Sequence, residues 1–150
     1  MTIVVGSDHA GLELRNHLSN HLKSLGHTVT EVGAMSAESF DYPNASDALV
    51  AEILENRASC GVLICGTGIG VSIRANRYPG IRAALCTSTE MAQMAVEHNQ
   101  ANVLCLGARI LEEAQARAIV DTYLAAKPDL GERHVRRVQM LDGHLSCGNH

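Results

Sequence analysis

Short apolar runs alternate with longer amphipathic segments along the chain, and this alternation limits the possible folds more than any other feature. The runs have the length and β-branched content of buried strands, and the segments have the apolar spacing of helices. The predicted strands cover residues 2–6, 27–32, 62–65, 81–86 and 102–106. Five repeats of strand and helix predict a parallel sheet with helices on both faces, because crossovers between parallel strands are right-handed. We therefore expect an α/β protein, a Rossmann-like three-layer α/β/α sandwich with a five-stranded parallel sheet.

Glycine, proline and capping residues mark the ends of the predicted helices. Leu14, Leu18 and Leu22 share one face of the first helix, and Gly26 ends it. Thr87 to Glu90 has the spacing of a capping box and marks the start of the fourth helix. Further helices are expected over residues 43–56, after the third strand as far as residue 76, over residues 112–125 and over residues 132–141.

The length of 150 residues suits a single domain whose core needs no disulfides or metal. A hydrophobic fraction of 46% and a charged fraction of 19% argue against disorder. We expect one domain over residues 1–142 and a mobile, glycine-containing tail over residues 143–150.

Composition also excludes several kinds of partner. No apolar run approaches the roughly 20 residues of a membrane span, and the chain enters its first strand without a signal-like segment. A net charge of -4, with one Phe, three Tyr and no Trp, gives little reason to expect nucleic acid. Five cysteines are an odd set, which fits reduced thiols better than disulfides. We expect a cytoplasmic protein with no membrane or nucleic-acid partner.

A loop with three glycines follows the third predicted strand and leads into a helix. It reads Cys65-Gly66-Thr67-Gly68-Ile69-Gly70. Glycines let successive backbone N–H groups converge, and the helix adds the positive end of its dipole, so the loop can hold an anion or a developing oxyanion. Cys65 lies at the mouth of this loop, where positive potential favours a thiolate that can act as a base. A tight turn with an inert buried cysteine stays open as the alternative.

Better-known glycine loops do not fit this stretch. A dinucleotide fingerprint requires glycine where Val71 stands, and no Gly-Lys-Ser/Thr follows at the spacing of a Walker loop. A cysteine-phosphatase loop would have arginine at position 71, whereas Arg74 lies farther along. The loop must therefore be interpreted together with residues from other strands.

Ligands of open parallel sheets bind beyond the carboxyl ends of the strands. Segments with reactive or charged side chains leave the predicted strands at that edge, namely Asp8-His9, Cys65 to Gly70, Cys86-Thr87 and Gly107 to Arg109. These candidates are expected to converge on one site.

A series of short motifs runs through nearly the whole chain. They are Gly6-Ser7-Asp8-His9-Ala10-Gly11, Asp41-Tyr42-Pro43, Leu63 to Gly70, Ala83-Ala84-Leu85-Cys86, His98 to Val103, Gly107-Ala108-Arg109, Arg133-His134 and Arg136-Arg137-Val138. In this order and at these intervals they resemble the ribose-5-phosphate isomerase B family, which also contains allose- and galactose-6-phosphate isomerases. The resemblance implies a sheet order of 2-1-3-5-4 and a homodimer or tetramer. It also implies an aldose-ketose isomerase that uses no metal and no cofactor.

The resemblance implies a role for each candidate residue. An aldose-ketose isomerase needs a base that carries a proton between C1 and C2, donors for the enediolate, a group that opens the sugar ring, and cations for the phosphate. Cys65 resembles the family's base, with Thr67 beside it, and His98 resembles the ring-opening residue, since imidazole both accepts and donates protons. The implied donors to the enediolate are the amides of Gly66, Thr67, Gly68, Ile69 and Gly70. Asp8 and Asn99 are the implied contacts of sugar hydroxyls, and Tyr42 is the implied site wall. The implied phosphate contacts are His9, Arg109, Arg133 and Arg137.

Several of these residues have simpler interpretations when each is taken alone. His98 fits a cap at a helix end, and Arg133 with Arg137 fits a solvated helix face. His17 and His21 have helical spacing for a metal, but they lack a third ligand, so a solvated surface is expected.

The leading prediction is an enzyme of carbohydrate metabolism that interconverts ribose 5-phosphate and ribulose 5-phosphate, as in the pentose phosphate pathway. Some family members use a glutamate shortly after the cysteine position, but residues 68–72 contain none, which leaves Cys65 as the base. The same chemistry on allose 6-phosphate or a tetrulose phosphate stays open, as does a non-catalytic module that binds a phosphate ligand. Cys65 together with His98 favours catalysis, because a binding loop has no use for a thiol at the base position.

The predicted topology separates two parts of this site. His98 and Asn99 precede the fifth strand and fall near the amino edge of the sheet, whereas Cys65 leaves the third strand at the carboxyl edge. A two-fold homodimer would bring the carboxyl-edge loops of one chain to the opposite edge of its partner. We therefore expect active sites that are shared between two chains.

Overall fold

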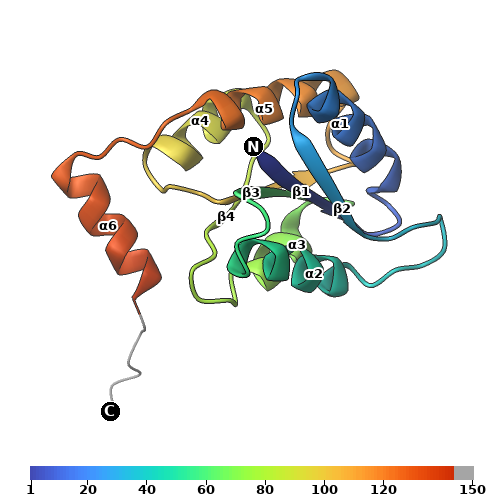
Figure 1. Cartoon of the computed structure of the whole chain (residues 1–150), viewed down its shortest axis with the longest axis horizontal. Coiled ribbons are helices and arrows are strands. Elements are labelled where there is room, and N and C mark those ends of the chain that lie inside the picture. The colour runs from blue at the N-terminus through green and yellow to red at the C-terminus, as the bar shows by residue number, and fades with distance from the viewer. Residues whose placement is uncertain (144–150) are drawn as a thin grey trace, which may run out of the picture.

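The computed structural model describes residues 1–143, so the predicted tail beyond Gly143 lies outside the described residues. Strands and helices alternate along the described chain (Figure 1). The strands are β1 (Thr2–Ser7), β2 (Thr28–Gly33), β3 (Cys60–Cys65), β4 (Ala83–Leu85) and β5 (Val103–Gly107). The helices are α1 (Leu12–Ser24), α2 (Tyr42–Leu54), α3 (Ile69–Ala75), α4 (Thr89–Glu97), α5 (Glu113–Ala125) and α6 (Glu132–Asp142). None of these helices is long and apolar enough to span a bilayer.

The strands form one parallel sheet in the order β2-β1-β3-β5-β4. Val5 of β1 is paired with Glu31 of β2 on one side and with Val62 of β3 on the other. Beyond β3, β5 is paired in parallel with both β3 and the edge strand β4. The α/β sandwich and the strand order 2-1-3-5-4 expected from the sequence are therefore confirmed.

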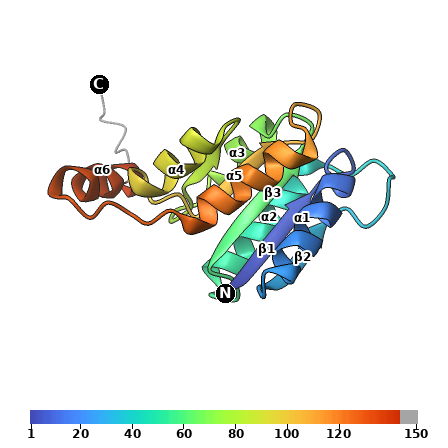
Figure 2. The ribbon, with the colours of Figure 1, turned by 90° about the horizontal axis from the view of Figure 1, so that it is seen from above.

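Helices cover both faces of the sheet (Figures 1 and 2). Ile3 and Val5 of β1 belong to the hydrophobic cluster that includes residues of α1, α4 and α5. Val4, between them, belongs to the cluster that includes residues of α2 and α3. Successive side chains of a strand point to opposite faces, so a strand covered by helices on both faces needs apolar residues at every position. This explains the continuous apolar runs of the sequence.

The fourth strand is shorter than the sequence predicts. A strand is expected over residues 81–86, but β4 covers only three residues. The side chain of Asn76 bonds to both backbone groups of Ala83, and the Asn102 side chain accepts a hydrogen bond from the Arg82 N–H at 2.8 Å. Side-chain amides thus replace part of the strand ladder at this edge.

The start of α4 also differs from the prediction. The capping box expected at Thr87 and Glu90 is not the cap that forms, because Ser88 has extended backbone angles and its Oγ accepts a hydrogen bond from the Met91 N–H at 3.2 Å. The cap therefore lies one residue later than the sequence motif indicates.

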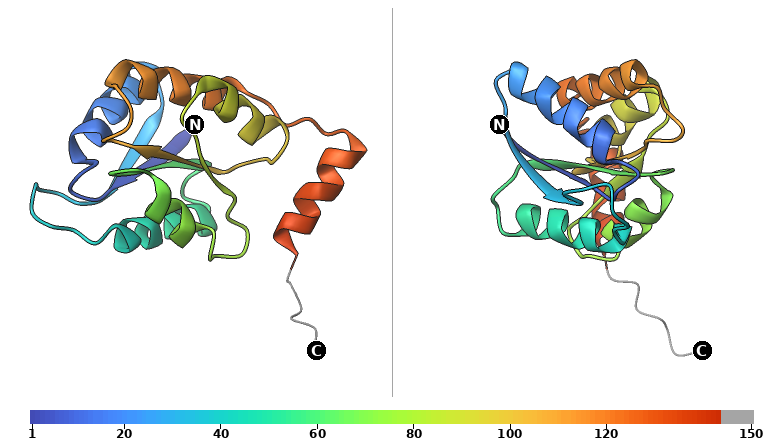
Figure 3. Two further views of the ribbon diagram at one scale, coloured as in Figure 1. Left: turned by 180° about the vertical axis from the view of Figure 1, so that it is seen from behind. Right: turned by 90° about the vertical axis from the view of Figure 1, so that its right-hand side faces the viewer.

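The last helix, α6, projects from the sandwich and is joined to α5 by an extended segment (Figures 1 and 3). Arg82, before β4, forms an ion pair with Asp142 at 2.9 Å. Leu130 and Met140 are each 73% exposed, whereas Val138 and His134 of α6 are buried.

Candidate active site

Cys65 ends β3 and places its thiol at the start of the glycine loop, residues 66–70. The side chain is buried, and its Sγ accepts a hydrogen bond from the Gly68 N–H at 3.2 Å. Gly68 has a φ of 80°, and a Cβ at this position would lie 2.9 Å from the carbonyl carbon of Leu106. Both features require glycine. Glycine at position 68 therefore lets the backbone N–H just before α3 point toward the sulfur of Cys65.

The loop after β5 packs directly against the glycine loop. The Arg109 N–H donates to the Gly66 carbonyl at 2.9 Å. A Cβ at Gly107 would lie 2.7 Å from the backbone of Thr67, so the two loops can approach this closely only with glycine there. The Arg109 guanidinium lies beside Gly66, since a Cβ added to Gly66 would meet Nη1 at 3.1 Å. A cationic side chain is thus placed next to the loop.

The loop after β1 fixes a carboxylate at the same edge of the sheet. Asp8 is 6% exposed, and its Oδ1 accepts a hydrogen bond from the Gly11 N–H at 3.0 Å. The Asp8 N–H donates to the Ile64 carbonyl, next to Cys65, at 3.3 Å. A Cβ at Gly11 would lie 2.8 Å from that same carbonyl oxygen, which explains the glycine.

His9 follows Asp8 and contacts the long loop between β2 and α2. Its Nδ1 accepts a hydrogen bond from the Phe40 N–H at 3.0 Å. Because Nδ1 is used as an acceptor, a neutral His9 ring carries its proton on Nε2. Nε2 is then a donor, as an anion contact requires.

Tyr42, the first residue of α2, lies against the start of α3. A Cβ added to Gly70 would lie 2.5 Å from Cε2 of the Tyr42 ring. The ring is 44% exposed and borders the glycine loop on the side of α2. Tyr42 thus lies beside the glycine loop, and its role as a site wall stays a prediction.

The structure does not bring every predicted residue to this edge. His98 caps the C-terminal end of α4, and α4 leads into β5, whose Val103 is paired with Gly61 near the start of β3. Asn99 is exposed and lines a pocket with Arg82 and Leu141.

The predicted site therefore falls into two groups. The first, at the carboxyl edge, is Asp8, His9, Tyr42, Cys65, Gly66, Thr67, Gly68, Ile69, Gly70 and Arg109. The second, near the amino edge and on α6, is His98, Asn99, Arg133 and Arg137. Arg133 and Arg137 are exposed on α6.

The four described cysteines, Cys60, Cys65, Cys86 and Cys105, are free thiols. Burial raises the pKa of Cys60 and of Cys86 to about 11. Burial also raises the pKa of Cys105, with nearby Cys65 and Cys86 contributing. These three thiols stay neutral at physiological pH and behave as small apolar side chains.

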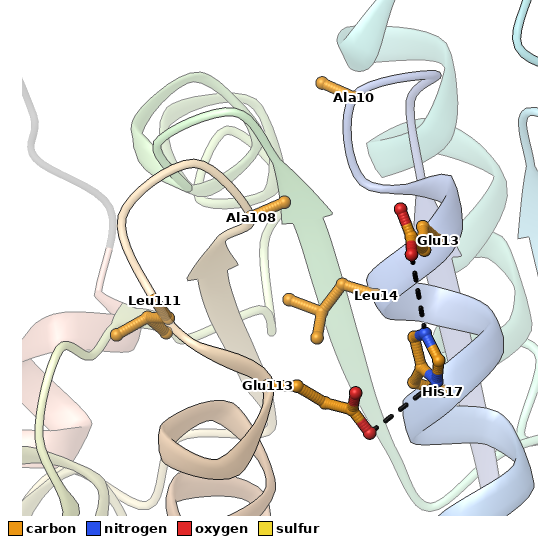
Figure 4. Close-up of a pocket in the computed structure, with 7 residues that line it drawn as sticks. All are labelled: Ala10, Glu13, Leu14, His17, Ala108, Leu111 and Glu113. Carbon is orange, nitrogen blue, oxygen red and sulfur yellow. Dashed lines mark ion pairs between the residues drawn. The ribbon is translucent and has the colours of Figure 1, made fainter.

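A separate pocket lies between α1 and the start of α5 (Figure 4). It is lined by Ala10, Glu13, Leu14, His17, Ala108, Leu111 and Glu113, none of which is a predicted site residue. His17 lies 3.7 Å from a Glu13 oxygen and 3.6 Å from a Glu113 oxygen, and one turn later His21 Nε2 lies 2.6 Å from Asp121. Within residues 1–143, no three His, Cys, Asp or Glu side chains gather in a way that could hold a metal ion.

Two residues near His98 were not given a role by the sequence. His134 is 6% exposed, and its ring stacks on the His98 ring with centroids 4.5 Å apart. Asp129 lies 3.5 Å from His134. From the sequence, His134 was named only as part of an arginine-rich motif. The signal that was available is its spacing of four residues from Val138, which puts both side chains on one face of the last helix.

Comparisons with known proteins give one consistent result. A family model described as Ribose/Galactose Isomerase matches residues 3–141. The chain is 38% identical to ribose-5-phosphate isomerase B of Escherichia coli over 139 residues, which are 93% of each chain. It is 40% identical to a putative sugar phosphate isomerase of Rickettsia bellii, and the match covers 92% of this chain and 96% of that one.

Solved structures agree with these matches. Ribose-5-phosphate isomerase B of Clostridium thermocellum superposes with a TM-score of 0.92 at 43% identity, covering 95% of both chains. The ribose 5-phosphate isomerase of Thermotoga maritima superposes with a TM-score of 0.91 at 47% identity, covering 94% of this chain and 97% of that one.

Proposed function

This chain belongs to the ribose/galactose isomerase family, and from that premise we propose that it interconverts ribose 5-phosphate and ribulose 5-phosphate. It is an aldose-ketose isomerase, an intramolecular oxidoreductase of sugar phosphates. The family match over residues 3–141 and the relatives that carry the name ribose-5-phosphate isomerase B support this substrate. The observation that carries the chemistry is the Cys65 thiol, buried at the mouth of a loop whose amide reaches its sulfur.

We assign the proton transfer to Cys65. As a thiolate it removes the proton from C2 of the open-chain aldose and returns a proton to C1, while a proton moves from O2 to O1. The enediolate between these steps carries negative charge on oxygen, and the amides of Gly66 to Gly70 with the Thr67 hydroxyl are its proposed donors. The hydrogen bond of 3.2 Å from the Gly68 N–H to Sγ supports this assignment, because an amide of the glycine loop lies directly beside the thiol.

We assign substrate binding to the charged groups around this loop. Asp8 Oδ1 is held by Gly11, and Oδ2 is the oxygen we assign to a sugar hydroxyl. His9 and Arg109 are the proposed phosphate contacts at this edge, since Nε2–H and a guanidinium are both suitable donors. Tyr42 closes the side toward α2.

The second group completes the site in this proposal. His98 opens the ring, Asn99 holds a hydroxyl, and Arg133 and Arg137 add phosphate contacts. Because these residues lie away from Cys65 in one chain, we propose a homodimer in which each active site takes the first group from one chain and the second group from its partner. We also infer a cytoplasmic location, which the free thiols of the described chain support.

A substrate panel tests the function. Initial rates are measured with ribose 5-phosphate, allose 6-phosphate, galactose 6-phosphate and erythrose 4-phosphate. Ribose 5-phosphate should give the highest kcat/KM. A higher value for allose 6-phosphate or erythrose 4-phosphate would assign the same chemistry to another sugar, and binding without turnover of any of them would identify a non-catalytic module.

A further inference from the structure

The proposed ring-opening residue is stacked on a second histidine. The rings of His98 and His134 have centroids 4.5 Å apart and planes inclined by only 6°. His98 follows the last residue of α4, whereas His134 belongs to α6, so the stack joins two elements that are far apart in the sequence. His134 is 6% exposed, which is unusual for a polar residue on a helix that projects from the molecule.

Asp129 holds this stack from the segment before α6. Its Oδ2 lies 3.5 Å from Nε2 of His134, and its Oδ1 accepts a hydrogen bond from the Gly131 N–H at 2.8 Å. The Asp129 N–H donates to the carbonyl of Glu97, the residue before His98, at 2.8 Å. One aspartate thus ties the end of α4 to the residue that stacks on His98.

We propose that His134, held by Asp129, is a positioning residue for ring opening. This inference rests on the proposed function. In ring opening, His98 takes the proton of the C1 hydroxyl and delivers a proton to the ring oxygen O4, while the C1–O4 bond breaks and a C1=O1 carbonyl forms. The imidazole must face both oxygens, but a side chain just beyond a helix end can rotate about two bonds. Stacking on a buried, anchored ring removes that freedom.

His134 does not touch the substrate in this proposal. It is buried, and its Nε2 faces Asp129, so it acts through His98. The effect of its loss should therefore be confined to the step that His98 performs. Ribulose 5-phosphate has no furanose ring, because its C5 oxygen carries the phosphate, and enolisation of this ketose requires only the base.

Two rates separate the steps. The first is the conversion of ribose 5-phosphate, which includes ring opening, and the second is the incorporation of solvent deuterium at C1 of ribulose 5-phosphate, which reports proton transfer by Cys65. His134→Ala should lower kcat for ribose 5-phosphate by about 10- to 100-fold, in line with the effect of a misplaced catalytic group, and leave KM and the deuterium exchange within about threefold. His134→Phe, which keeps a flat ring, should recover part of the lost kcat.

His21→Ala is the matched control, because it removes another histidine that pairs with a carboxylate, at 2.6 Å from Asp121 between α1 and α5. Both rates should be unchanged in this variant. A parallel fall of both rates in His134→Ala would mean that His134 only supports the fold, and unchanged rates would remove any role; either result overturns the inference. Wild-type protein that shows neither rate would instead overturn the proposed function.

Discussion

Cys65 and Cys105 are the same residue type on neighbouring strands, but their surroundings differ. Cys105 lies two positions before the end of the neighbouring strand and is 0% exposed among apolar side chains, with its pKa raised by burial. Cys65 lies at the last position of β3, where the strand gives way to the glycine loop and an amide donor reaches the sulfur. The end of the strand therefore separates a thiol among apolar side chains from one that contacts a backbone donor, and the second is the thiol that we propose as the base.

Replacing Cys65 by alanine should abolish isomerisation while leaving affinity for a phosphate-containing inhibitor within a few-fold. The thiol moves a proton in our mechanism and does not hold the phosphate, and general bases contribute about 10²- to 10⁴-fold to rate. Steady-state kinetics and inhibitor titration measure the two effects. Cys86→Ala is the control, since it removes a buried thiol whose pKa is raised to about 11, and it should keep wild-type kcat. A Cys65→Ala enzyme with more than about a tenth of wild-type kcat would mean that another group is the base.

At the scale of the elements, the candidate site depends on loops whose backbones pack so closely that only glycine fits at the points of contact. The glycine loop and the loop after β5 touch at Gly107, and the loop after β1 touches the end of β3 at Gly11. Parallel strands bring all three loops to one edge, and the glycines allow them to close on each other.

Gly107→Ala tests this close packing. The added Cβ would lie 2.7 Å from the Thr67 backbone, so the glycine loop must shift, and we expect kcat to fall by at least about tenfold with a loss of about 1–3 kcal/mol of stability. Activity assays and thermal unfolding measure both. Gly143→Ala, whose Cβ would meet its nearest atom at 3.4 Å, should leave kcat unchanged. Wild-type activity in Gly107→Ala would show that the loop geometry is not needed for catalysis.

The elements were predicted well where one local signal decides them. Short continuous apolar runs predicted the strands, and amphipathic runs of period 3.6 predicted the helices. Their alternation predicted a parallel sheet covered on both faces. The sequence could not show that Asn76 and Asn102 bond to the backbone of Ala83 and Arg82 at β4, because these contacts join residues that are 7 and 20 positions apart. For the same reason the contact of His134 with His98 was missed, as it joins two helices that sequence periodicity treats separately.

The site was predicted in part by the same logic. Cys65 ends a strand, and Asp8 and Arg109 lie just after the ends of two others. The rule that ligands bind beyond the carboxyl ends of strands therefore predicted that the three lie at one edge. The bond between His9 and Phe40 links residues 31 positions apart and depends on the path of an irregular loop. The spacing of apolar residues along the sequence does not predict such a contact.

At the scale of the whole molecule, the two groups of proposed site residues lie at opposite ends of the strands. β3 has six residues, and strands of this length are about 17–20 Å long. His98 precedes β5 and is stacked on α6, whereas Cys65 ends β3. One chain therefore does not bring its own His98 to its own Cys65, which is the reason that we propose a second copy as the source of His98.

Mixing two inactive variants tests this shared site. When Cys65→Ala and His98→Asn chains exchange subunits, a mixed dimer has one site with both residues intact and one site that lacks both. With random exchange about half of the dimers are mixed, so activity should recover to about a quarter of wild type. Mixing Cys65→Ala with Asp8→Asn is the control, because both residues belong to the first group and every site in that mixture keeps one defect. If exchange is demonstrated and neither mixture recovers activity, Cys65 and His98 must act from the same chain, and α4 must then approach the carboxyl edge in the active enzyme.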